Sequence, residues 1–129
     1  MQRDGYYPYQ TLVDAYGNGG FRFADMSHKG SLLCLPSGMH AWPVSAIGQL
    51  NMESFAPVFA VADKIDVLMV GMGVQVAYFD PELRRAFKQR NIIVEAIGTG
   101  SAISTYNILF AEKRAVAAAL IAVTDAGAR

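Results

Sequence analysis

Two glycine-bearing segments and the helix that follows them carry the residue types best suited to binding. The segments are Gly71-Met72-Gly73 and Gly98-Thr99-Gly100-Ser101, and the downstream polar residues are Thr105, Tyr106 and Asn107. Each segment follows an apolar run. The second also opens a helical segment, whose first N–H groups and positive dipole end attract anions. We expect these residues to form one site for a phosphate, a carboxylate or a backbone segment of a partner.

A purely structural interpretation of the same residues stays open. The glycines would then permit tight turns, Thr99 or Ser101 would cap the helix, and Asn107 would pack internally. A dinucleotide site is disfavoured, because Gly71-x-Gly73 lacks the third glycine of that fingerprint and no helix start follows it directly.

Other patterns for catalysis or metal binding are weak. His28 and His40 have no partner at metal-ligand spacing, and no G-x-S-x-G motif appears. Glu112 and Arg114 lie in a segment expected to be helical, where they form a solvated face or reach the sheet as a base and an anion clamp. We therefore predict no catalytic residue, no metal and no cofactor.

Composition favours a soluble, cytoplasmic protein. The 129 residues include 11 basic and 11 acidic ones, so no basic excess points to nucleic acid. Cys34, the single cysteine, excludes an intrachain disulfide and suits a buried thiol. The longest apolar run, residues 115–123, is shorter than the ~20 residues that span a bilayer, and the N-terminal residues lack the apolar core of a signal peptide.

The elements that must position the candidate site follow from turn signals and periodicity. We predict a single domain over residues 1–129, with residues 1–10 as an irregular arm. Residues 11–44 alternate in a β pattern broken by turns such as Gly17-Asn18-Gly19-Gly20. Ser54 is expected to cap a short helix.

The second half of the chain predicts a βαβ unit followed by a long helix. Residues 65–70 and 92–97 are apolar runs typical of buried parallel strands, and Asp80-Pro81-Glu82 marks the start of a helix between them. Residues 102–122 are predicted to form the longest helix. The fold class is therefore α/β, with three layers, a mixed sheet with flanking helices and an additional β-hairpin region.

Aromatic and methionine side chains in the first third indicate a protein-binding surface. They are Tyr6, Tyr7, Tyr9, Met39 and Trp42. Exposed residues of these types favour protein contacts, although the arm could also bury them.

Several stretches together resemble a small three-layer α/β domain family that includes a mitochondrial complex I assembly factor and an adipogenesis-associated protein. The matching stretches are Tyr16-Gly17-x-Gly19-Gly20-Phe21-Arg22-Phe23, Gly30-Ser31-Leu32-Leu33-x-Leu35-Pro36, Trp42, Asp66-Val67-Leu68-Met69-Val70-Gly71-Met72-Gly73, Thr99-x-x-Ala102-x-x-Thr105-Tyr106-Asn107-x-Leu109 and Glu112-x-Arg114-x-Val116-Ala117-Ala118-Ala119-Leu120. The resemblance covers residues 16–123. It implies a mixed five-stranded sheet flanked by helices.

The resemblance also implies a non-enzymatic role in binding or assembling other proteins, by analogy those of a respiratory membrane complex. The alternative is a small-molecule or anion-binding domain, with or without catalysis, whose site lies at the glycine turns. The expected partners are other proteins, and a homo-oligomer stays open.

Overall fold

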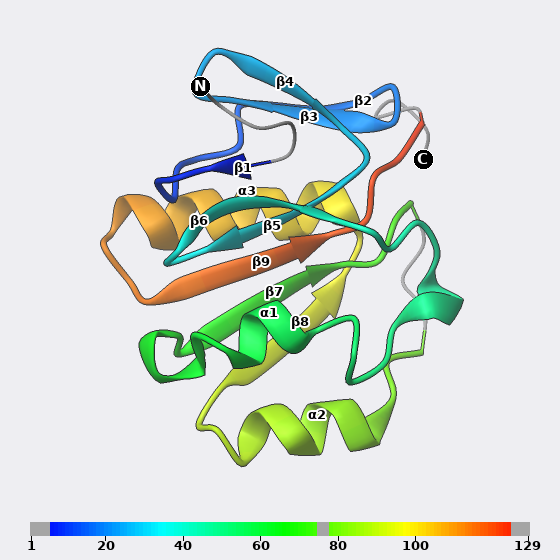
Figure 1. Ribbon diagram of the computed structural model, residues 1–129, viewed down its shortest axis with the longest axis vertical. Helices are drawn as coiled ribbons and strands as arrows, with labels where there is room; N and C mark the ends of the chain where they lie inside the picture. Colours follow the sequence, from blue (N-terminus) through cyan, green and yellow to red (C-terminus); the bar gives the residue numbers. More distant parts are fainter. Residues whose placement is uncertain (1–5, 75–77, 125–129) are drawn as a thin grey trace.

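The protein, described by a computed structural model over residues 6–74 and 78–124, has a six-stranded and a three-stranded sheet (Figure 1). The strands are β1 (Tyr6–Tyr7), β2 (Ala15–Gly17), β3 (Gly20–Phe23), β4 (Met26–Lys29), β5 (Ser31–Leu35), β6 (Gly38–Trp42), β7 (Val67–Gly71), β8 (Ile93–Ile97) and β9 (Val116–Leu120). The helices are η1 (Ile47–Gln49), α1 (Ala56–Phe59), η2 (Ala62–Lys64), α2 (Pro81–Lys88) and α3 (Thr99–Ala111).

The main sheet is mixed and has the order β1-β6-β5-β9-β7-β8. The predicted βαβ unit is confirmed, because β7 and β8 flank α2 in the chain and pair in parallel. Strand β9 is parallel to β7 and antiparallel to β5, so it joins the parallel and antiparallel parts. The sixth strand is β1, which pairs Tyr6 with His40 and Tyr7 with Met39. Residues 6–7 of the expected irregular arm are therefore a strand, and residues 1–5 lie outside the described part.

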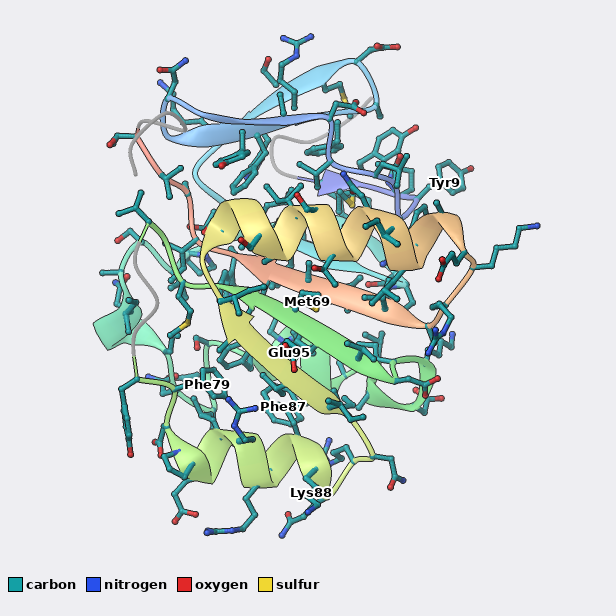
Figure 2. All side chains as sticks on the ribbon, turned by 180° about the vertical axis from the view of Figure 1, so that it is seen from behind. Tyr9, Met69, Phe79, Phe87, Lys88 and Glu95 are labelled. Atoms are coloured by element: carbon teal, nitrogen blue, oxygen red, sulfur yellow. The ribbon has the colours of Figure 1, made fainter. Side chains whose placement is uncertain are left out.

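The main sheet separates two hydrophobic cores and gives the molecule its three layers. Side chains of α1 and α2, such as Val58 and Phe87, pack on one face against Leu33, Leu68 and other alternate strand residues. Helix α3 and the small sheet β2-β3-β4 cover the opposite face, as Figures 1 and 2 show. Because β9 lies in the middle of the sheet, each of its residues is buried.

Local rules explain the helix within the βαβ unit. The Asp80 side chain accepts a hydrogen bond from Glu82 N, and Pro81 occupies the first turn, as the sequence predicts. Leu83 and Phe87 face the core. The expected cap at Ser54 is wrong, because α1 begins after Phe55 and the Ser54 hydroxyl bonds to Asn51 O instead.

The predicted helix over residues 102–122 is also wrong. Helix α3 ends at Ala111, and Lys113 takes a left-handed conformation with φ of 62°. The chain then returns as β9. Alanines 117–119 have high helix propensity, yet they form the centre of the sheet. Ala118 belongs to the core beneath α3, whereas Ala117 and Ala119 face the core on the side of α1 and α2.

The second strand of the βαβ unit is buried on one face only. Val94 is buried, whereas Ile93 and Glu95 are exposed, because α3 lies mainly over β7 and β9 and β8 is the edge of the sheet. In the described part of the chain, the structure contains no helix long and apolar enough to cross a membrane.

Candidate functional site

The two predicted glycine segments do meet at the carboxyl ends of β7 and β8. We call residues 71–73 and 98–101 the glycine rim. Gly71 lies opposite Ile97 in the parallel register, and Thr99 N donates to Gly73 O at 2.8 Å. The parallel pairing of β7 and β8 therefore brings both segments to one edge of the sheet, as the sequence predicts.

Thr99 is the centre of the glycine rim and is fully buried, with 0% of its surface exposed. Its Oγ1 donates to Ile121 O at 2.8 Å and accepts from Gly73 N at 2.9 Å. One hydroxyl thus fastens the first turn of α3 to the segments that follow β7 and β9. This hydroxyl is committed to internal hydrogen bonds rather than turned toward a ligand.

Two glycines of the rim make room for close packing. A Cβ at Gly71 would lie 2.9 Å from Thr99 Oγ1 and 3.1 Å from Leu120 Cδ2, and a Cβ at Gly100 would overlap the Tyr16 hydroxyl. The Tyr16 ring therefore lies directly against the first turn of α3. Helix α3 begins at Thr99 with Gly98 in the N-cap position, and no side chain caps it, so the expected capping by Thr99 or Ser101 is wrong.

The polar residues farther along α3 face a different neighbour. Asn107 clamps Val13, because its Nδ2 donates to Val13 O at 2.8 Å and its Oδ1 accepts from Val13 N at 3.0 Å. The Tyr106 hydroxyl donates to Thr11 O at 2.8 Å. Both side chains hold residues 11–13 against the helix, so they serve the N-terminal segment and not the rim. Thr105 is half-buried, and Ser101 is exposed on the same helix.

Burial keeps two potential nucleophiles, one on α3 and one on the sheet beneath it, in their protonated forms. It raises the pKa of the Cys34 thiol and of the Tyr106 phenol far above their usual ranges. Cys34 is free and 0% exposed, as expected for a small apolar side chain. A thiol that stays protonated is a poor nucleophile and a poor metal ligand.

The structure also contains no group of three or more His, Cys, Asp or Glu residues able to hold a metal ion within residues 6–74 and 78–124. The two histidines hold local structure. The His28 ring bonds with Ser31 O, and the His40 ring bonds with Ser37 Oγ.

The aromatic and methionine side chains that the sequence predicts at the surface divide into two groups. Tyr9 is 69% exposed and Tyr6 is 37% exposed, whereas Met39 and Trp42 are buried at 0% and 3%. Trp42 Nε1 donates to Ser54 O at 2.7 Å, which explains how a buried indole is satisfied. Tyr9 lies beside the carboxyl-terminal end of α3 in Figure 2.

The same end of α3 has an open hollow of about 490 Å³. We call it the α3-end hollow, and Leu12, Phe110, Ala111, Lys113 and Arg114 line it. Of these residues, only Arg114 is a candidate from the sequence, as an anion clamp, and the others carry no sequence signal for a site. The turn at Lys113 has no glycine to signal it, so the sequence pattern predicts one continuous helix through this segment.

The geometry defines a mixed α/β domain whose fold is shared with solved structures. A crystal structure described as an outer membrane protein from Bartonella henselae matches with a TM-score of 0.86 and 44% identity, covering 91% of this chain and 98% of that one. A Rhodopseudomonas palustris protein solved by NMR matches with a TM-score of 0.83 and 45% identity, covering 95% and 91%. A Mth938-like domain from Bordetella pertussis matches with a TM-score of 0.77 and 26% identity, covering 97% and 93%.

The chain belongs to the family described as "Protein of unknown function (DUF498/DUF598)", which matches residues 13–121. Among curated proteins, the chain is 30% identical to "NADH dehydrogenase [ubiquinone] 1 alpha subcomplex assembly factor 3" of Xenopus tropicalis over 85% of this chain and 60% of that protein. It is 32% identical to an uncharacterised Rhodobacter capsulatus protein over 88% of this chain and 86% of that protein. The chain spans about 60% of the length of the assembly-factor relatives it matches.

Proposed function

We propose that this chain is a non-enzymatic protein-binding domain that helps to assemble a respiratory membrane complex. The observation that carries the proposal is its similarity, at 30% identity over 85% and 89% of the chain, to proteins of Xenopus tropicalis and Mus musculus named as complex I assembly factors. The complex and the partners of this chain are part of the proposal, because the relatives are longer than this chain.

The state of the glycine rim supports a binding role elsewhere on the surface. The Thr99 hydroxyl forms hydrogen bonds with Gly73 N and Ile121 O, and Gly100 packs against the hydroxyl end of Tyr16. The alternative of a small-molecule or anion site would have to use donors of this rim other than the Thr99 hydroxyl. We therefore do not assign the function to the rim, where ligand or partner binding stays a prediction.

The proposal is tested by deleting the gene in the organism that encodes the chain and measuring assembled respiratory complexes on native gels. We expect less of one fully assembled complex and more of a subassembly. An epitope-tagged copy that restores assembly should migrate with that subassembly. Crosslinked affinity purification should then recover subunits of the same complex.

Two controls make the experiment decisive. Total membrane protein and an unrelated respiratory complex should be unchanged by the deletion. Normal assembly of every respiratory complex, with no subunit crosslinked to the tagged chain, would overturn the proposal. The cytoplasmic location expected from the sequence is also a proposal, and fractionation of the tagged strain tests it.

A further inference from the structure

The α3-end hollow combines an apolar floor with two cationic side chains. Leu12 is 37% exposed, Phe110 is half-buried and Ala111 is exposed, so apolar surface faces the hollow from two segments of the chain. Lys113 and Arg114 are exposed, and neither forms an ion pair with another described residue. The volume of about 490 Å³ lies within the ~300–1,000 Å³ typical of binding pockets.

The backbone that carries these cations is held in place by hydrogen bonds. Lys113 N donates to Phe110 O at 2.9 Å, and Arg114 N donates to Leu109 O at 3.0 Å. Lys113 occupies the left-handed position after the helix, where glycine is favoured and residues with a Cβ are strained. The two hydrogen bonds are the pattern that closes a helix at its carboxyl-terminal end, so the backbone beneath both cations is fixed.

The local electrostatics favour an anionic occupant. The carboxyl-terminal end of α3 contributes only about half a negative charge, whereas Lys113 and Arg114 contribute two positive ones. Glu112 is exposed in the same turn but does not line the hollow. A carboxylate at the hollow would therefore meet two cations, one of them a guanidinium able to bind it bidentately.

Exposed apolar surface extends beyond the hollow. Tyr9 is exposed and lies beside the same end of the helix, as Figure 2 shows. Gln10 fixes this neighbouring segment, because its Nε2 donates to Val116 O at 2.7 Å. An occupant longer than a single side chain could thus contact Tyr9, the hollow and the cations in succession.

We propose that the α3-end hollow binds a short acidic segment of a partner polypeptide. One large apolar side chain of that segment lies against Leu12, Phe110 and Ala111, and flanking carboxylates contact Lys113 and Arg114. The inference rests on the proposed protein-binding function and names the surface and the chemistry of the partner.

Binding is tested with short fluorescein-labelled peptides in which a central leucine or phenylalanine is flanked by glutamates. Matched peptides carry alanine at the centre or lysines at the flanks. We expect only the acidic peptides with a large apolar residue to bind, with affinity that falls as salt rises. In isotope-labelled protein, their addition should shift the amide signals of Leu12, Phe110 and Ala111.

Variants of the protein separate binding from folding. Ala111→Glu fills the hollow and adds a negative charge, and Arg114→Glu replaces a positive charge with a negative one. Each should weaken binding of the acidic peptides by about tenfold or more. Lys113→Gly should weaken binding while raising Tm, because glycine relieves the left-handed strain. Lys88→Glu is the matched control on α2, far from the hollow in Figure 2, and should bind as wild type does.

Several results would overturn the inference. They are equal binding of acidic and basic peptides, amide shifts that map elsewhere, no binding by any panel peptide, and concentration-dependent self-association through the hollow. The Arg114→Glu variant should also lose the subunits crosslinked in cells. If that variant keeps them, the hollow is the wrong surface while the proposed function stands; if wild type crosslinks none, the proposed function itself fails.

Discussion

The two ends of α3 use their side chains in opposite ways. At the amino-terminal end, the Thr99 hydroxyl makes two internal hydrogen bonds and Gly100 lies beneath Tyr16. At the carboxyl-terminal end, Lys113 and Arg114 are exposed beside an apolar hollow and form no ion pair within the described residues. The end that resembles a ligand site by composition uses its central hydroxyl internally, and the end without a motif has two cationic groups available for contact.

This contrast teaches that residue types alone do not locate a site. Hydroxyls and glycines near a helix start are compatible both with anion binding and with tight packing. The hydrogen-bond partners of each polar group decide between them. Substitutions at the two ends should therefore differ sharply in their cost to stability.

The largest effect is expected at Thr99. Thr99→Val keeps the shape but leaves Gly73 N and Ile121 O without their partner, so the free energy of unfolding should fall by about 3 kcal/mol. Urea denaturation followed by circular dichroism measures it. Thr99→Ser keeps the hydroxyl, so its free energy of unfolding should fall by much less. A Thr99→Val protein as stable as wild type would contradict the structural role of the rim.

The next effect is expected where the Tyr16 ring lies on the helix. Gly100→Ala raises helix propensity, but its Cβ overlaps the Tyr16 hydroxyl. Because the overlap should cost more than the propensity gains, the free energy of unfolding should fall by about 1 kcal/mol. In a Tyr16→Phe background the overlap is reduced, so the same substitution should become neutral or stabilising. Urea denaturation of wild type, Gly100→Ala, Tyr16→Phe and the double variant gives the coupling free energy between the two residues. Equal effects in both backgrounds would show that the two residues do not interact.

At the other end, a substitution should stabilise the fold. Lys113→Gly removes the strain of a lysine in the left-handed conformation but adds conformational freedom to the unfolded chain. The free energy of unfolding should rise by about 0.5 kcal/mol. Differential scanning calorimetry should show a higher Tm. The matched change Lys88→Gly lies within α2 and should lower Tm instead, since glycine disfavours a helix. A drop in Tm for Lys113→Gly would mean that the lysine side chain stabilises the turn.

The smallest effect on stability is expected at Arg114. Arg114→Glu changes an exposed side chain that forms no ion pair with the residues the structure describes, so the free energy of unfolding should change by less than about 0.5 kcal/mol. Urea denaturation at moderate salt tests this value. A large loss would show that the arginine is structural, and the contrast between the two ends of α3 would then disappear.

Local signals allowed much of the fold to be predicted. The start of α2 follows from Asp80 and Pro81, whose effects act within one turn of the chain. The β2–β3 turn follows in the same way, with Asn18 at a φ of 54° between two glycines that also have positive φ. The parallel pairing of β7 and β8 was predictable because a helix separates two apolar runs.

The features of the fold that could not be predicted depend on contacts between residues far apart in the sequence. Ala117, Ala118 and Ala119 favour a helix locally, yet their place between β5 and β7 makes them the centre of the sheet. The turn at Lys113 has no glycine to mark it. The polar partners of Tyr106 and Asn107 lie about a hundred residues earlier, at Thr11 and Val13, which no local pattern indicates.

The central position of β9 has a consequence for the order in which the protein can fold. Strands β5 and β7, to which β9 pairs on either side, both precede it in the chain, so neither can complete its ladder before residue 120 is synthesised. Until then, the nascent chain carries two unsatisfied sheet edges with largely apolar residues. During synthesis these edges are open to chaperones and to mispairing with neighbouring chains, and the arrival of five small and aliphatic residues closes both at once.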